Sequence, residues 1–160
     1  MKTLMLFSDG SVNTKLKVGF GAYLLISNIE LPLENIKNLI KIKQFVDTSS
    51  TKLELQTLLW ALNEIHNFDG KVLVYTDSQN IIGLQNRKER FEKNNFSSKK
   101  NTFIKNHIIY QEFYRITEKL NCEFIKVKGH KNSIQKDKID LTFSLVDKAS
   151  RKALKNYIQI

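Results

Sequence analysis

Hydrophobic positions along the chain follow the two-residue period of strands in some segments and the three-to-four-residue period of helices in others. Alternating or wholly apolar runs predict strands at residues 3–8, 18–27, 39–45, 71–76 and 122–127. Helical spacing predicts helices over residues 52–68, over a short segment from 78, over 102–120 and over about 141–157. We expect a turn at residues 10–17, a loop at 28–38 and a loop or short helix in the stretch up to about 101.

This order of elements, β-β-β-α-β-α-α-β-α, predicts an α/β protein with a five-stranded mixed sheet and helices on both faces. No repeat, linker or low-complexity tract divides the chain, so we expect one domain over residues 1–160. The helical crossover should place the strand at 71–76 parallel to the strand at 3–8. The ends of these two strands would then lie at the same edge of the sheet, where α/β proteins usually place their sites.

Two apolar strands stop on an aspartate at this edge. Asp9 precedes Gly10, a pair typical of turns, and Asp77 precedes Ser78, a plausible helix N-cap. Each aspartate therefore has a structural explanation as well as a functional one.

Glu54 also has two explanations. The segment Thr51-Lys52-Leu53-Glu54 fits a capping box, in which the glutamate bonds back to the cap residue. Glu54 equally lies on a helix face with Leu58, Ala61 and Ile65, which should point toward the sheet. A carboxylate on such a face needs a partner, a cation or a raised pKa.

Two further candidates lie near the end of the chain. Asp147 shares a helix face with the apolar side chains Phe143 and Leu154, whereas Asp137 and Asp140 lie in a lysine-rich stretch that suits surface aspartates. His130 follows a strand and a glycine, so it is expected on a loop, where a histidine often has no role.

Composition narrows the function classes. Hydrophobic residues make up 41% and charged residues 26% of the 160 residues, as in an ordinary globular protein. No apolar run is long enough for a membrane span or signal peptide, and the single Cys122, expected to be buried at a strand start, fits a reducing compartment. We therefore expect a cytoplasmic protein, and a monomer, because no exposed apolar heptad is present.

The net charge of +10 is confined to two segments. Residues 1–84 hold eight basic and eight acidic residues, while residues 85–105 hold seven and two, and residues 121–160 hold nine and four. Basic patches of this kind suit phosphate binding, although a solvated surface is the alternative. Acidic residues that converge at a sheet edge suit Mg²⁺ or Mn²⁺, and two such ions can activate a water and stabilise a leaving oxygen of a phosphodiester.

Five segments together resemble the motifs of type 1 ribonuclease H, in that family's order and over nearly the whole chain: "FSDGSV", "STKLELQTLLWAL", "VYTDSQ", "KVKGH" and "VDKASRKAL". The resemblance implies a ribonuclease H-like fold and an endonuclease that cuts the RNA strand of RNA–DNA hybrids with two Mg²⁺ ions, leaving a 3′-hydroxyl and a 5′-phosphate. Mn²⁺ is a plausible substitute. The substrate partner would be the hybrid, with no membrane involved.

The resemblance also assigns roles to residues. It implies that the metal ligands are Asp9, Glu54, Asp77 and Asp147, and that His130 aids proton transfer and product release. It further implies a set of substrate contacts: Gly10, Ser11 and Asn13 near the backbone, Ser50, Thr51 and Lys52 in the minor groove, and Lys99 and Lys100 on the DNA strand.

The chain departs from the family pattern in three places. Ser50 and Thr51 stand where the family usually has asparagines, so we expect weaker hybrid affinity or RNA/DNA discrimination. The turn after Asp9 has no proline and few glycines, and the segment between His130 and Asp147 is long. We choose Asp147 over Asp137 and Asp140 as the last ligand because "DKASRKAL" matches the family's final helix. Rival functions are a nuclease of this fold that acts on another nucleic acid and a binding domain that does not cut.

Overall fold

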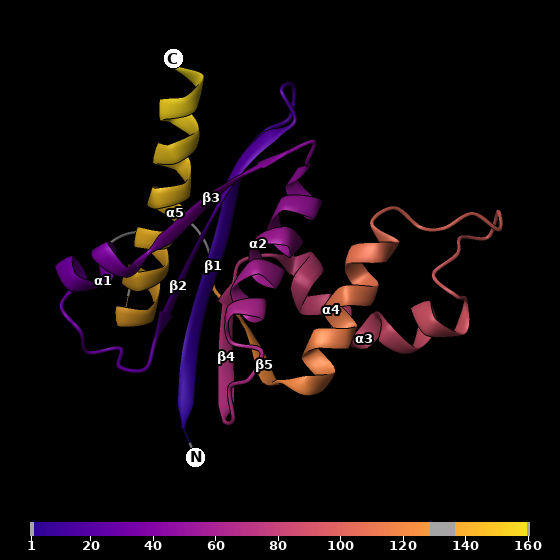
Figure 1. The fold of residues 1–160 in the computed structure, drawn as a ribbon, viewed down its shortest axis with the longest axis horizontal. Coiled ribbons are helices and arrows are strands. Elements are labelled where there is room, and N and C mark those ends of the chain that lie inside the picture. Colours follow the sequence, from indigo (N-terminus) through magenta and orange to yellow (C-terminus); the bar gives the residue numbers. More distant parts are fainter. Residues whose placement is uncertain (1, 129–136, 160) are drawn as a thin grey trace.

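The computed structural model describes residues 2–128 and 137–159 (Figure 1). Its elements, in chain order, are β1 (Thr3–Asn13), β2 (Val18–Ile26), α1 (Leu33–Leu39), β3 (Lys41–Val46), α2 (Ser50–Glu64), β4 (Lys71–Thr76), α3 (Gln79–Lys93), α4 (His107–Lys119), β5 (Asn121–Lys126) and α5 (Lys138–Ile158). The strands form one sheet in the order β3-β2-β1-β4-β5. The predicted five-stranded mixed sheet is thus confirmed.

Pairing within the sheet follows from the connections. β1 pairs antiparallel with β2 after a four-residue connection, and β2 pairs antiparallel with β3 after residues 27–40, which contain α1. β4 and β5 follow helical crossovers and pair parallel with β1 and β4, respectively. Helices α2, α3 and α4 cover one face of the sheet, and α1 and α5 cover the other (Figure 1). The apolar strand β4 is covered on both faces, as its composition predicts: Val74 packs with the first group of helices and Tyr75 with the second.

The predicted turn at residues 10–17 is wrong in its first half. β1 continues to Asn13, because its residues pair in register with β2 as far as Asn13↔Val18. Backbone pairing with β2 therefore overrides the turn tendency of the Asp9-Gly10 pair, and only residues 14–17 form the connection.

The predicted loop at residues 28–38 is also partly wrong. It contains α1, which starts directly after Pro32 and buries the side chain of Ile36 completely. Proline suits a helix start because it has no N–H to leave unpaired there. A seven-residue helix of this kind is stabilised by its tertiary packing, which the sequence pattern does not show.

The helices differ from the predicted ones mainly at their ends. α3 is not short but runs to Lys93, and α4 begins at His107 rather than 102, because Ser97 and Phe103 form a β-bridge in the connection between them. α2 begins at Ser50, ends at Glu64 and so stops before residue 68.

The predictions for the edge strands also need correction. β3 was expected to expose one face, but it is exposed along nearly its whole length because it lies at the sheet edge. Cys122 in β5 is half-buried rather than buried, and burial still raises the pKa of its thiol to about 11.

Helix α2 packs very closely on the antiparallel strands. A Cβ atom at Gly21 of β2 would overlap the hydroxyl of Thr57, and one at Gly10 of β1 would lie 2.9 Å from Cδ2 of Leu53. The absence of side chains at these two positions allows α2 to approach the sheet. This approach brings the first turns of α2 close to β1.

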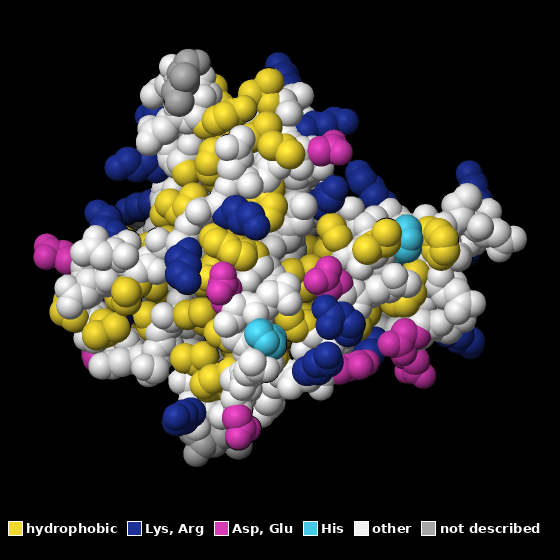
Figure 2. Space-filling model, in the orientation of Figure 1, with side chains coloured by type: hydrophobic (Ala, Val, Ile, Leu, Met, Phe, Trp, Pro, Cys, Tyr) yellow, Lys and Arg dark blue, Asp and Glu magenta, His cyan; other side chains and the backbone are white. Residues whose placement is uncertain are grey.

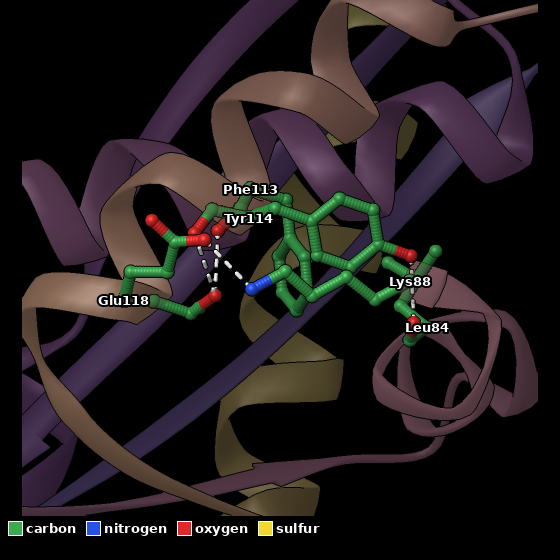
Figure 3. Close-up of polar contacts among 6 residues, drawn as sticks. Leu84, Lys88, Phe113, Tyr114 and Glu118 are labelled. Carbon is green, nitrogen blue, oxygen red and sulfur yellow. Dashed lines mark hydrogen bonds and ion pairs between the residues drawn. The ribbon is translucent and has the colours of Figure 1, made fainter. Parts of the chain in front are cut away.

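Helices α3 and α4 are joined by a polar contact that involves Tyr114 (Figure 3). The hydroxyl of Tyr114 donates a hydrogen bond of 2.6 Å to the carbonyl oxygen of Leu84, and Lys88 Nζ lies 2.7 Å from Glu118 Oε1. Burial raises the pKa of Tyr114 to about 12, so the hydroxyl stays protonated and continues to donate. These contacts fix the basic helix α3 against the rest of the fold.

Among residues 2–128 and 137–159, none of the helices combines the length and the apolar character needed to span a membrane.

Candidate metal and nucleic-acid site

Two aspartates converge where β1 and β4 separate. The parallel pairing of these strands ends at Phe7↔Tyr75, and Asp9 and Asp77 each follow two residues later. Asp9 is buried, with 7% of its surface exposed, although it lies within a strand and not in a turn. The turn explanation for Asp9 is therefore wrong, and the predicted edge is where the two side chains meet.

Glu54 joins these aspartates from α2. One carboxylate oxygen from each of Asp9, Glu54 and Asp77 lies within 4.8 Å of the other two. The capping-box explanation for Glu54 is wrong, because the N-cap of α2 is Ser49, whose side chain accepts from the backbone N–H of Lys52. Glu54 thus lies in the second turn of the helix. Its carboxylate takes no part in the helix cap and lies with Asp9 and Asp77 instead.

Ser78 connects Glu54 to the start of α3. Its hydroxyl accepts a hydrogen bond of 3.2 Å from the backbone N–H of Ile81, which confirms its predicted role as an N-cap. The same hydroxyl forms a hydrogen bond with the Glu54 carboxylate. One serine therefore both starts α3 and orients a carboxylate of the site.

Asp147 reaches the cluster from α5. Its side chain forms a hydrogen bond with that of Asp9, and its Oδ1 lies 3.0 Å from Nε of Arg151 one turn further along. The other two candidates for this position have structural tasks: Asp137 is the N-cap of α5, and Asp140 completes a capping box with it. Asp140 is buried rather than at the surface as expected.

The crowding of carboxyl groups alters their proton affinity. Burial, followed by the hydrogen bond with Asp147 and the negative charge of Asp77, raises the pKa of Asp9 to about 9, well above its ordinary 3.8. Burial also raises the pKa of Glu54; the hydrogen bond from Ser78 opposes that rise and the charge of Asp77 adds to it.

This donor set fits a divalent cation. Carboxylate oxygens are the ligands that Mg²⁺ and Mn²⁺ prefer, and a cation would relieve the electrostatic cost that raises the pKa of Asp9. Arg151 neutralises only part of the negative charge, and it does so at Asp147. Asp9, Glu54 and Asp77 are therefore the residues best placed to hold a metal.

The three residues of β1 that were predicted to contact the substrate each contact another part of the protein. The hydroxyl of Ser11 lies 3.1 Å from that of Ser150, and Asn13 Oδ1 accepts from the backbone N–H groups of Lys15 and Leu16. Gly10 faces Leu53 of α2. His130, predicted to assist proton transfer, lies outside the described residues.

Ser50 and Thr51 border a hollow of about 460 Å³ between α2 and the start of α4. The hollow is lined by hydroxyl, amide and ammonium groups that suit a sugar–phosphate backbone: Thr14, Ser49, Ser50, Thr51, Asn80, Lys105 and Asn106, with Tyr110 beside them. Lys52, the third predicted residue, instead donates from Nζ to the carbonyl oxygen of Asp47.

Lys99 and Lys100 lie in the connection between α3 and α4, which extends away from the sheet (Figure 1). Lys99 borders a second hollow of about 630 Å³, together with Arg90 of α3 and Ser98. The basic segment thus forms a projection separate from the carboxylate cluster.

Several residues that complete the site were missed from the sequence. Arg151 follows Asp147 by four residues, a helical ion-pair spacing that could have revealed it. Ser78 was identified only as a cap. Lys105 belongs to the basic segment 85–105, but Asn80 and Asn106 gave no local signal, because only the fold brings them beside Ser50.

The sheet, its helical layers and the carboxylates at the end of β4 define an α/β protein with an acidic site suited to divalent cations. Comparison of the sequence with family models gives a match to the RNase H family over residues 1–152. The chain belongs to the RNase H family, as its motifs predict, and is an enzyme of the ribonuclease class.

Relatives of similar length share about a quarter of their residues with this chain. A ribonuclease H of Clostridium botulinum is 28% identical over 143 residues, covering 88% of this chain and 92% of the relative. A ribonuclease H of Acetivibrio thermocellus is 27% identical over 156 residues, covering 95% of this chain and 100% of the relative.

Solved structures confirm the fold. A foamy viral protease-reverse transcriptase in complex with an RNA/DNA hybrid matches 94% of this chain with a TM-score of 0.65 and 11% identity, although the match covers only 19% of that chain. The same viral protein in complex with dsDNA matches 92% of each chain with a TM-score of 0.62 and 12% identity.

Proposed function

We propose that this protein hydrolyses the RNA strand of RNA–DNA hybrids by a two-metal-ion mechanism and leaves a 3′-hydroxyl and a 5′-phosphate. The observation that carries the proposal is the convergence of Asp9, Glu54 and Asp77 within 4.8 Å in a member of the RNase H family. Two relatives named ribonuclease H match this chain over nearly their full lengths.

Four carboxylates hold the ions in this proposal. Asp9 and Asp77 are shared most closely by the two ions, and Glu54 binds beside the ribose of the strand to be cut. Asp147, which contacts Asp9, is the fourth ligand. Mg²⁺ is the expected ion and Mn²⁺ a substitute; when bound, they supply an activated water and charge stabilisation for the leaving oxygen. Ser78 keeps the Glu54 carboxylate in place, and His130 assists proton transfer.

Substrate binding is divided between two surfaces. The hollow bordered by Ser50 and Thr51 offers donors and acceptors to the sugars and phosphates of the hybrid. The projection with Lys99 and Lys100 supplies positive charge to the DNA strand. Gly10, Ser11 and Asn13 of β1 contact the substrate backbone in this proposal.

The direct test uses one duplex length in four forms: RNA–DNA hybrid, RNA–RNA, DNA–DNA, and DNA with a single ribonucleotide. Each is incubated with the protein and Mg²⁺, then with EDTA, and the products are resolved by strand and end group. We expect cutting only in the RNA strand of the hybrid, with a 3′-hydroxyl at the new end, and no cutting in EDTA.

Two variants separate chemistry from binding. Asp9→Asn and Asp77→Asn should remove metal-dependent cutting while leaving the fold and much of the hybrid binding intact, because each keeps the side-chain volume but loses the negative charge that holds the metal. Retained activity in Asp77→Asn would overturn the two-metal assignment, and cutting of another duplex by the parent protein would overturn the substrate.

We further propose that the protein acts as a cytoplasmic monomer. The single cysteine and the net charge of +10, which opposes self-association, support this state. A molar mass by light scattering that rises to twice the 18.6 kDa of the chain at working concentration would contradict it.

A further inference from the structure

A groove on the molecule takes no part in the proposed chemistry. It lies between α1, the edge strand β3 and α5, and has a volume of about 650 Å³. Its lining contains none of the four carboxylates, and it is formed by apolar and lysine side chains: Lys37, Ile40, Ile42, Leu145, Lys148, Ala149, Lys152, Ala153 and Asn156.

The floor of this groove is apolar and open to solvent. Ile42 of β3 is 46% exposed, because β3 is the sheet edge and α5 covers it only in part. On the opposite wall, α5 presents Ala149 and Ala153, whose short side chains leave room beside the helix. Exposed apolar surface in a concave position is typical of an interaction site.

The rim of the groove is positively charged. Every charged residue among the described side chains that line it is a lysine: Lys37 from α1 and Lys148 and Lys152 from α5. All three are exposed. Figure 2 shows hydrophobic side chains together with Lys and Arg side chains over the region where α5 and β3 lie in Figure 1.

This combination selects one kind of occupant. A second copy of this chain would bring its own charge of +10 toward the three lysines, so self-association is opposed. A nucleic-acid backbone would satisfy the lysines but would leave Ile42 and the α5 alanines without apolar partners. An acidic peptide with apolar side chains satisfies both the floor and the rim.

We propose that the groove between α1, β3 and α5 is a docking site for an acidic segment of a partner protein, which places apolar side chains on the floor and carboxylates against Lys37, Lys148 and Lys152. The partner is a second protein, and the interaction is separate from cleavage.

Fluorescence anisotropy with labelled synthetic peptides tests this proposal on the full chain. The first peptide alternates Asp and Glu with Leu and Phe, and the second replaces each Leu and Phe by Ser at the same charge. We expect binding of the first peptide that weakens with salt, and binding of the second that is weaker by about tenfold or more, which is about 1.4 kcal/mol.

Variants assign the binding to the groove. Lys37→Glu with Lys152→Glu should weaken binding of the first peptide by about tenfold or more. Ile42→Ser should weaken it by about threefold without changing the charge. The matched control, Lys2→Glu with Lys119→Glu, makes the same charge change at exposed positions elsewhere and should stay within about twofold. Circular dichroism and thermal unfolding check that each variant is folded.

Four outcomes would overturn the proposal. Equal binding of the two peptides would show that only charge is recognised. An equal loss in the control and groove variants would place the binding elsewhere. A parallel loss of RNA–DNA hybrid binding in Lys37→Glu with Lys152→Glu would show that the groove binds nucleic acid instead, and a dimer abolished by Ile42→Ser would show that it binds a second copy.

Discussion

Asp9 is the residue whose chemistry depends most on its surroundings. Its neighbours along the chain suggest a turn, but its position in β1 buries it beside Asp77 and Asp147. Burial and negative neighbours raise its pKa to about 9, so at neutral pH without metal this carboxyl holds a proton.

This raised pKa predicts a pH-dependent stability of the metal-free protein. The pKa of Asp9 is about 9 in the folded state against 3.8 ordinarily, so between these values the folded state binds a proton that the unfolded state releases. Stability from this group is therefore full below about pH 4 and is lost as the pH rises through about 9. We expect Asp9→Asn, which stays neutral, to be more stable than the parent near pH 9 by roughly 1–3 kcal/mol.

Urea unfolding in EDTA across this pH range measures the difference, which should vanish near pH 4. Asp69→Asn, at an exposed carboxylate in the connection between α2 and β4, is the matched control and should show no such trend. A parent protein whose stability rises steadily from pH 4 to 9 relative to Asp9→Asn would contradict the assigned protonation.

Single residues differ in how well the sequence predicts them. Asp77 and Ser78 could be placed because a parallel strand and a helix cap have clear local patterns. The choice between cap and site for Glu54 could not be made, because the actual cap, Ser49, differs from the expected one by two residues, and only the fold shows this.

At the scale of elements, the position of α2 decides whether the site forms. α2 carries Glu54 and is held close to the sheet at Gly21, where a Cβ would overlap the Thr57 hydroxyl. The spacing between α2 and β2 is thus set by a missing side chain.

Gly21→Ala should therefore destabilise the protein by roughly 1–3 kcal/mol, the usual cost of overpacking. Gly83→Ala is the matched control: its Cβ would have its nearest neighbour at 3.7 Å inside α3, so the better helix propensity of alanine should stabilise the protein by roughly 0.5–1 kcal/mol. Urea unfolding of both variants measures the two effects, and destabilisation by Gly83→Ala as large as that by Gly21→Ala would refute the packing argument.

The junction of α3 and α4 gives a second prediction for elements. Tyr114→Phe removes the 2.6 Å hydrogen bond to the Leu84 carbonyl without changing the ring and should cost about 1 kcal/mol of unfolding free energy. Tyr157→Phe, at a residue that is 39% exposed, should change this free energy by less than about 0.5 kcal/mol. Equal thermal stability of the two variants would mean that the Tyr114 hydroxyl does not hold the helices together.

Among the elements, strands defined by a continuous apolar run were predicted well, and elements whose extent depends on tertiary contacts were predicted poorly. Strands β4 and β5 fall within one residue of their predicted ends because apolar runs define them. Helix α1 was missed since its seven residues depend on burial of Ile36 and not on an amphipathic pattern.

At the scale of the whole molecule, one of the two basic segments lies apart from the carboxylate cluster. The excess positive charge comes from residues 85–105 and 121–160, and the first of these segments includes α3 and the projection that carries Lys99 and Lys100. The basic projection thus lies apart from the acidic cluster, whereas Arg151 in the second segment pairs with Asp147.

Lys99→Ala with Lys100→Ala should weaken hybrid binding and flatten its salt dependence, lowering the slope of log K against log salt by up to about 2, since each phosphate contact contributes roughly 0.9. Cleavage at saturating hybrid should remain. Binding isotherms at several salt concentrations measure the slope, with Lys2→Ala and Lys119→Ala as the matched pair of exposed lysines. An unchanged slope would show that this projection does not grip the substrate.

The sequence by itself indicated the positions of the strands and main helices, the parallel placement of β4 beside β1 and the four candidate carboxylates, because each follows from local periodicity, a crossover or a motif. The tertiary structure decided what local patterns cannot: that Asp9 lies within a strand, that Ser49 rather than Thr51 caps α2, and that Asp140 is a buried capping residue. It also placed Asn80 and Asn106 beside Ser50 and opened the groove along β3. These features depend on contacts between residues far apart in the chain, so only packing of the whole fold could settle them.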